Sequence, residues 1–220
     1  MTFLSVPFVG FLIISLIVYY SIPIKSRWAV LLMESLSFYL YASRDSFWVL
    51  IVTVAVSYIA SRLLSCLKEN EASARRQKVA LALSVALIVL PLLVIKEGNF
   101  ILLSFLNRSK VSLIVPLGIS FYTMQIIAYL TDIYRGRITP EKSFLKYTLF
   151  VSYFPQIIQG PIPRYEQLAG QLIREHKFDE QSFIGGLQRI LWGVFLKLMI
   201  ADKAGVIVDT IFASPEVYRG

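Results

Sequence analysis

The stretch from Tyr153 to Tyr165 holds the residue types best suited to chemistry. Two amides, Gln156 and Gln159, stand there with three prolines, a glycine and Arg164 in an otherwise apolar setting. A helix facing lipid cannot carry this set, because lipid offers no hydrogen-bond partners. Arg164 could hold a carboxylate or phosphate in its planar fork, or could anchor the chain at the membrane boundary. We expect this stretch to lie in a polar cavity sheltered by protein.

A second set of polar side chains follows helical spacing. Intervals of four, three and four residues separate Gly118, Tyr122, Gln125 and Tyr129. This spacing stacks the four residues on one helix face, which should point into protein or into a cavity. Two interpretations stay open: hydrogen bonds to neighbouring helices, which are common in membrane bundles, or the wall of a substrate channel. The substrate-pocket candidates are therefore Arg164, Gln156, Gln159, Tyr122 and Gln125.

The remaining ionisable residues give weaker indications. His176 is the one histidine, and its charged neighbours indicate a solvated surface residue instead of a general base. Glu34 lies inside an apolar run and is a functional candidate by default, although the sequence names no partner for it. Asp132 and Arg135 are expected to pair locally at a helix end. One cysteine and one histidine exclude metal sites built on either residue, so we expect no metal in this chain.

A basic stripe occurs further along the chain. Arg189, Gly193 and Lys197 follow one another at intervals of four residues. The two charges could bind a phosphate-bearing acyl donor, or could reach out to the membrane surface from near the ends of the segment.

Composition indicates the elements that must position these residues. The chain has 220 residues, of which 56% are hydrophobic and 16% charged, and the apolar residues form long blocks. A formal charge of +8 could indicate nucleic acid, but basic connections between apolar blocks are typical of the inner face of a membrane. We predict an all-α polytopic transmembrane bundle with re-entrant and interfacial helices, forming a single membrane domain over residues 1–220.

The apolar blocks define the predicted helices. Four anchor spans within residues 1–98 are expected at Pro7–Ile22, Trp28–Ala42, Phe47–Ala60 and Val79–Ile95. Residues 99–220 are expected to begin with a re-entrant or interfacial piece at Phe100–Leu106 and a full span at Val111–Leu130. A proline-broken segment at Phe144–Pro163, which could form a crossing or a hairpin, an interfacial helix at Glu166–Gln181 and a span at Phe183–Ala201 are expected to follow. The first and third connections carry seven lysines and arginines against two in the second and fourth, which predicts an N-terminus outside.

Four short motifs carry a family resemblance. They are VPLGISFY at Val115–Tyr122, YLTDIYRG at Tyr129–Gly136, FPQIIQGPI at Phe154–Ile162 and WGVFLK at Trp192–Lys197. In this order and spacing they resemble the membrane-bound O-acyltransferases, and most of all the bacterial alginate O-acetylase branch. Among the family's polar pocket residues, the one that matches here is Arg164, which follows the Gly-Pro motif.

The resemblance implies a function for the whole enzyme. Such a protein, in the bacterial cytoplasmic (inner) membrane, moves an acyl group, here expected to be acetyl, to a hydroxyl of an extracytoplasmic polysaccharide or cell-envelope polymer. It implies no bound cofactor, a thioester donor substrate such as acetyl-CoA or a carrier-protein-linked acyl group, and an acyl-accepting partner outside the membrane. The family's histidine lies in a Trp-His-Gly-type stretch of its second half, which this sequence lacks, so the resemblance implies no catalytic residue in this chain. The chain resembles an amino-terminal half whose carboxy-terminal half is missing. The alternative is a non-catalytic membrane scaffold or transporter fragment, and no nucleic acid is expected.

Overall fold

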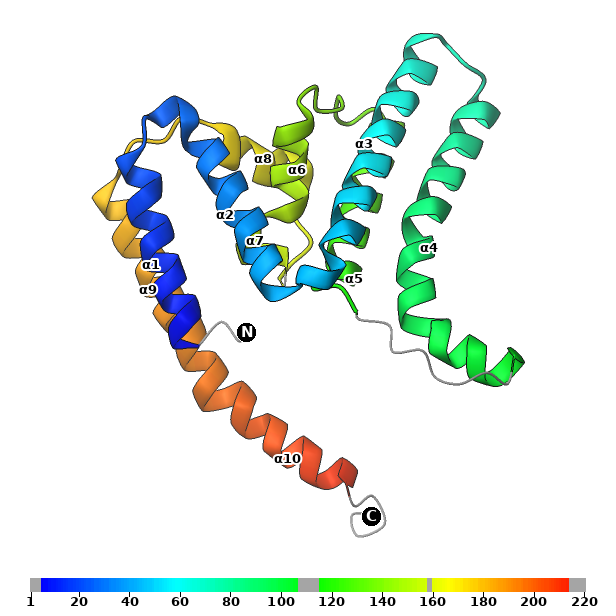
Figure 1. Ribbon diagram of the computed structural model, residues 1–220. Coiled ribbons are helices and arrows are strands. Elements are labelled where there is room, and N and C mark those ends of the chain that lie inside the picture. The colour runs from blue at the N-terminus through cyan, green and yellow to red at the C-terminus, as the bar shows by residue number, and fades with distance from the viewer. Residues whose placement is uncertain (1–4, 107–114, 158–159, 214–220) are drawn as a thin grey trace. The chain divides into compact units, whose positions relative to one another are not determined.

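The structure is a computed structural model that describes residues 5–106, 115–157 and 160–213 (Figure 1). All regular secondary structure within these ranges is helical, which confirms the predicted all-α class. The chain forms two compact units, one of residues 14–175 and one of residues 1–13 with 176–220. The predicted division at residue 98 into anchor spans and an acyltransferase core stays a prediction.

The first helices follow the apolar blocks closely. They are α1 (Val6–Ser21), α2 (Arg27–Ala42), α3 (Phe47–Glu69) and α4 (Ala74–Leu106). In the described residues, two helical stretches are long and apolar enough to cross a membrane, Arg44–Glu69 and Ala74–Lys96. The helix α1 is apolar but has 16 residues, which span about 24 Å against a hydrocarbon core of about 30 Å. Two of the four anchor spans predicted in this region therefore meet the length criterion.

The separate re-entrant piece predicted at Phe100–Leu106 is not confirmed. These residues continue α4, whose last part turns aside from the rest of the helix in Figure 1. Seven apolar residues are too few for a span, but a helix that already exists can extend through them one residue at a time, which costs far less than nucleating a new helix.

The inner face of α3 is a seam of small residues. Four of its seven buried residues are small, namely Thr53, Ser57, Ala60 and Ser61, and the others are Leu50, Val54 and Leu64. The hydroxyls of Thr53 and Ser57 donate to carbonyl oxygens of their own helix, at 2.7 and 3.0 Å. Small side chains with their hydroxyls already satisfied allow neighbouring helices to approach closely. The helices α4 and α5 both pack against α3.

The helix α5 is shorter than the predicted span at Val111–Leu130. It covers Ile119–Tyr134, while residues 107–114 lie outside the described ranges. Pro116 lacks a backbone N–H, and Gly118 has a φ of +68°, in the left-handed region. These two residues turn the chain so that the helix begins only at Ile119.

The proline-broken segment is broken as predicted. It forms α6 (Phe144–Ser152) and the single turn α7 (Phe154–Ile157), with Tyr153 between them outside the helical region. The last six residues of α6 are all buried, so protein shelters this helix, whereas Gly160 and Pro161 after it are exposed.

The predicted interfacial helix at Glu166–Gln181 is wrong in its extent. The helix α8 covers Tyr165–Ile173, and residues 174–179 are irregular. Leu168, Ala169 and Leu172 form its buried stripe, and the next positions at helical spacing, 175, 176 and 179, carry polar side chains that cannot continue that stripe.

The second unit contains the helices near the end of the chain. They are α9 (Glu180–Phe195), a π-helical stretch at Leu196–Ala201 and α10 (Asp202–Ala213). Asp179 caps α9 by accepting a hydrogen bond from the Ser182 N–H at 2.9 Å. The predicted span at Phe183–Ala201 is not one of the two stretches that meet the membrane criterion, since α9 ends at Phe195, where the helical geometry changes.

Candidate functional site

Three elements of the larger unit hold buried polar atoms with unused hydrogen-bonding capacity. Glu34 and Tyr39 belong to α2, Tyr122 and Thr123 to α5, and Gln156 to α7. The atoms are Glu34 Oε1, Tyr39 Oη, Tyr122 Oη, Thr123 Oγ1 and Gln156 Oε1, none of which has a hydrogen-bond partner within the described ranges. A buried polar atom left in this way costs about 1–3 kcal/mol. Such atoms are rare in folded proteins, and a polar ligand would account for them here.

Two of these groups lie beside each other. Tyr39 and Tyr122 are almost fully buried, with 0% and 1% of their surface exposed. The two hydroxyls interact with each other, and that of Tyr39 also interacts with Ser43, although none of these contacts meets the full geometry of a hydrogen bond. A phenol O–H rotates about its C–O bond, so either hydroxyl can turn to donate to a third group, such as a carbonyl oxygen.

A close backbone approach brings α7 to the start of α5. A Cβ atom on Gly118 would lie 1.8 Å from the carbonyl oxygen of Ile157. Any side chain at Gly118 would therefore push α7 away. Gln156, which precedes Ile157, is held near the first turn of α5 by this contact.

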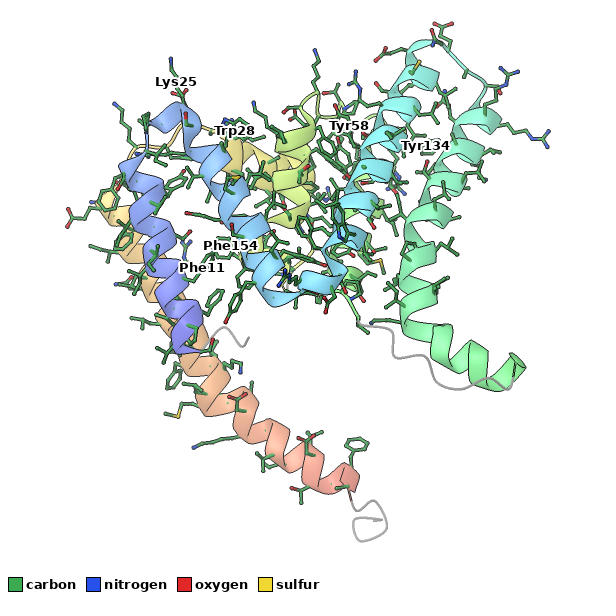
Figure 2. The ribbon with its side chains drawn as sticks, in the orientation of Figure 1. Phe11, Lys25, Trp28, Tyr58, Tyr134 and Phe154 are labelled. Atoms are coloured by element: carbon green, nitrogen blue, oxygen red, sulfur yellow. The ribbon has the colours of Figure 1, made fainter. Side chains whose placement is uncertain are left out.

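The helix α2 fixes the other side of α7. The Phe154 N–H donates to the Ser35 hydroxyl at 3.2 Å, and the rings of Phe154 and Phe38 have centroids 5.7 Å apart. Figure 2 shows Phe154 beside α2. The single turn α7 is thus held by α2 and by α5, although it is too short to be stable alone.

Glu34 has a partner that the sequence did not reveal. The Ser15 hydroxyl of α1 donates to Glu34 Oε2 at 2.5 Å, while Oε1 has no partner in the described residues. Tyr153, at the break between α6 and α7, interacts electrostatically with the Glu34 carboxylate. One carboxylate oxygen therefore has a structural role, and the other is available to a ligand.

The other pocket candidates differ in position. Gln125 is buried, and its amide donates to the Phe150 carbonyl at 2.9 Å, so it joins α5 to α6 as an interhelical hydrogen bond. Arg164 is exposed, and it begins α8 by accepting the N–H groups of Gln167 and Leu168 at its carbonyl oxygen. Gln159 lies outside the described residues. Of the five candidates, the structure places Tyr122 and Gln156 among the unsatisfied polar atoms.

A second cluster surrounds the carboxylate of Glu141. The Tyr165 hydroxyl donates to Oε2 at 2.6 Å, and the Ser143 N–H donates to Oε1 at 2.9 Å. Burial acts to raise the pKa of Glu141, but these hydrogen bonds, the Lys142 N–H and the charge of Lys146 together lower it. Burial and the Glu141 carboxylate raise the pKa of Tyr165, so the pair holds an ionised acid beside a neutral phenol.

Aromatic rings support this carboxylate. The Tyr129 ring lies 4.9 Å from that of Tyr165 and 5.1 Å from that of Tyr147, centroid to centroid, and the Tyr129 hydroxyl accepts the Glu141 N–H at 2.9 Å. Tyr58 reaches from α3 toward the segment before α6 (Figure 2) and donates to the Lys142 carbonyl at 2.6 Å. With every acceptor oxygen of Glu141 hydrogen-bonded, this cluster joins helices and is less available to a ligand.

The other charged residues are on the surface. His176 is exposed between α8 and α9, where the sequence indicated a solvated position. The predicted pair between Asp132 and Arg135 is wrong: Asp132 pairs with Arg137 at 3.2 Å, because the turn after α5 brings the later arginine back. Lys197 pairs with Asp202 at 3.5 Å, and Arg189 is exposed on α9.

Comparison with known proteins shows what the chain is similar to. No protein-family model matches the sequence, and no solved structure matches it significantly. A probable alginate O-acetylase AlgI of Azotobacter vinelandii is 30% identical over 220 residues, which cover 96% of this chain and 43% of that protein. The probable AlgI of Pseudomonas aeruginosa is 36% identical over 102 residues, covering 46% of this chain and 19% of that protein. A peptidoglycan O-acetyltransferase of Helicobacter pylori is 32% identical over 137 residues, covering 50% of this chain and 26% of that protein.

The two apolar helices of membrane-spanning length and these relatives indicate a helical membrane protein that is similar to O-acetyltransferases. Over nearly all its length the chain is similar to a probable alginate O-acetylase. It spans less than half the length of the curated relatives that it matches.

Proposed function

We propose that this chain serves a membrane O-acetyltransferase that moves an acetyl group from a thioester donor to a hydroxyl of an extracytoplasmic polysaccharide or cell-envelope polymer. The observation that carries the proposal is the similarity to a probable alginate O-acetylase across 96% of the chain. The buried polar atoms of α2, α5 and α7 support it, because a polar substrate would give each of them a partner.

The chemistry needs a base, a held carbonyl and a leaving thiol. The base takes the proton of the acceptor hydroxyl as its oxygen attacks the thioester carbonyl. The C–S bond then breaks, the acetyl group stays on the acceptor oxygen, and the thiol leaves with a proton. The family resemblance implies that a histidine outside this sequence is the base. Within this chain, the hydroxyls of Tyr39 and Tyr122 are suited to donate to the carbonyl oxygen as negative charge develops on it.

We also propose the donor substrate, the membrane orientation and the partners of this enzyme. The donor is acetyl-CoA or an acyl group on a carrier protein, and it acts from the cytoplasm. The protein crosses the bacterial inner membrane several times with its N-terminus outside, as the distribution of lysine and arginine between the connections indicates. The complete system also includes an acyl-accepting protein or polymer outside the membrane and a carboxy-terminal half that carries the histidine. Arg164 and Gln159 remain proposed residues of the substrate pocket.

Acetyl transfer in isolated membranes tests this function. Membranes that contain the chain together with a histidine-bearing second half should transfer radiolabelled acetyl groups from acetyl-CoA to alginate or peptidoglycan, and the 220-residue chain alone should not. Replacing Tyr122 with Phe should lower the rate by about 10²-fold, the size expected for loss of one donor to the developing charge. The matched control is Tyr41→Phe, because 73% of the Tyr41 surface is exposed.

Two results would overturn the proposal. One is transfer by the 220-residue chain alone, whether it depends on His176 or survives His176→Ala. The other is solute flux into liposomes that contain the chain, without any acetyl transfer in the complete system, since this would favour the transporter alternative.

A further inference from the structure

A groove runs between α3 and α4 on the outer surface of the larger unit. It has a volume of about 520 Å³. Its lining residues are Leu63, Arg75, Arg76, Val79, Ala80, Leu83, Ser84 and Leu87. The two arginines come first on α4, and the apolar residues follow them along the helix, so one end of the groove is cationic and the rest is apolar.

The apolar part forms a continuous stripe. Val79, Leu83 and Leu87 recur at intervals of four residues and are 50%, 62% and 59% exposed, which places them on one face of α4. The Ser84 hydroxyl, the one polar group in this part of the lining, donates to the Ala80 carbonyl at 2.8 Å. The wall therefore offers no free hydrogen-bonding group to a ligand beyond the arginines.

The arginines are free to bind an anion. Arg75 and Arg76 are both exposed, and in the described part of the chain no carboxylate lies within ion-pair distance of either guanidinium. The acidic side chain of Glu69, at the end of α3, accepts a hydrogen bond from Ser65 at 2.9 Å. The planar fork of arginine matches two oxygens of a phosphate.

The dimensions match one leaflet of a bilayer. From Arg76 to Leu87 the helix rises about 16 Å at 1.5 Å per residue. Half of a hydrocarbon core of about 30 Å is about 15 Å. The helix that carries the groove is one of the two stretches of membrane-spanning length. A molecule with a phosphate at one end and an acyl chain one leaflet deep would fill both parts of the groove.

We propose that this groove binds an anionic phospholipid, with its phosphate on Arg75 and Arg76 and an acyl chain along Val79, Leu83 and Leu87. Basic pockets between membrane helices hold anionic headgroups in the same way. An apolar groove alone would accept the chain of any lipid, and the paired arginines at its end give the preference for negative charge.

Native mass spectrometry of the purified protein in detergent tests the site. The protein is mixed with equal amounts of phosphatidylglycerol and phosphatidylcholine of the same acyl length, and the retained lipid is counted for each. We expect phosphatidylglycerol to be retained in preference, with that preference falling about fivefold for each arginine removed in Arg75→Gln and Arg76→Gln. The charge-matched control is Arg62→Gln with Lys78→Gln, since both residues are exposed and neither lines the groove.

Each outcome bears on the proposal. The proposal is overturned if the unaltered protein retains both lipids equally. It is also overturned if the control variant, Arg62→Gln with Lys78→Gln, loses as much preference for phosphatidylglycerol as the variant with Arg75→Gln and Arg76→Gln. Competition by free glycerol phosphate with no need for an acyl chain would overturn the lipid assignment. Folding is checked by helical circular dichroism, and the single variants give the answer if the double variant does not fold. Acetyl transfer is not read out, so the proposed function can fail without affecting this test.

Discussion

The contact between Gly118 and Ile157 predicts a large loss of stability in Gly118→Ala. The alanine Cβ would have to occupy space 1.8 Å from the Ile157 carbonyl oxygen, and the residue would keep a φ of +68°. The left-handed conformation costs a non-glycine residue about 1–2 kcal/mol. Overpacking against backbone adds about 1–3 kcal/mol. We therefore expect the free energy of unfolding to fall by about 2–5 kcal/mol.

A glycine elsewhere in the same unit provides the control. A Cβ on Gly170, in the interior of α8, would meet nothing within 4 Å. Gly170→Ala should leave stability unchanged or raise it by up to about 1 kcal/mol, because alanine favours a helix interior. Unfolding is followed by circular dichroism as sodium dodecyl sulfate is added to the protein in mild detergent micelles. If Gly118→Ala unfolds at the same detergent fraction as the unaltered protein, the inferred approach of α7 to α5 is wrong.

Three further predictions concern the Glu141 cluster and the orientation of α3. Tyr165→Phe removes the 2.6 Å hydrogen bond to Glu141 and should cost about 1 kcal/mol in the same unfolding assay, with Tyr41→Phe unchanged; equal stability of the two variants would contradict it. Because hydrogen bonds lower the pKa of Glu141, its ionised form stabilises the fold above the ordinary value of 4.5, and this contribution is lost as the pH falls through the lowered value. When unfolding is measured from pH 7 to 3, the free energy of unfolding should fall less in Glu141→Gln than in the unaltered protein. An equal fall in both would refute the stabilising role of the ionised Glu141 carboxylate. Cys66 is exposed near the end of α3, and the proposed orientation places that end on the cytoplasmic side of the membrane. A membrane-impermeant maleimide should therefore label Cys66 in inverted vesicles and not in intact cells. Labelling from outside would reverse the proposed orientation.

Periodicity was sufficient to predict the inward face of α5. Tyr122, Gln125 and Tyr129 are all buried there, as their spacing indicates, because a helix repeats every 3.6 residues whatever surrounds it. The spacing does not show which of these polar groups lacks a partner within the protein, because that depends on the tertiary structure. The amide of Gln125 meets the Phe150 carbonyl of another helix, while the Tyr122 hydroxyl meets no acceptor in the described residues, and the local sequence does not distinguish the two cases.

Long-range partners were out of reach of the sequence for the same reason. Glu34 is bound by Ser15 from a separate helix, nineteen positions earlier, and no periodic pattern pairs them. The ion pair of Asp132 required the turn at Gly136, where a φ of +73° brings Arg137 back over the helix end in place of Arg135. Arg164, chosen because it follows the Gly-Pro motif, lies exposed at the start of α8, and the structure does not test its proposed role.

The small-residue seam of α3 also bears on how the bundle keeps its alignment. Small side chains permit close packing but provide few directional contacts, while Leu50, Val54 and Leu64 supply the larger apolar contacts of the same face. Two phenol groups add directional contacts: Tyr147 donates to Ser57 at 2.8 Å, and Tyr58 donates to the Lys142 carbonyl at 2.6 Å. Because a hydrogen bond forms only within a narrow range of distance and angle, these two groups favour one alignment of α3 against the segment that holds α6.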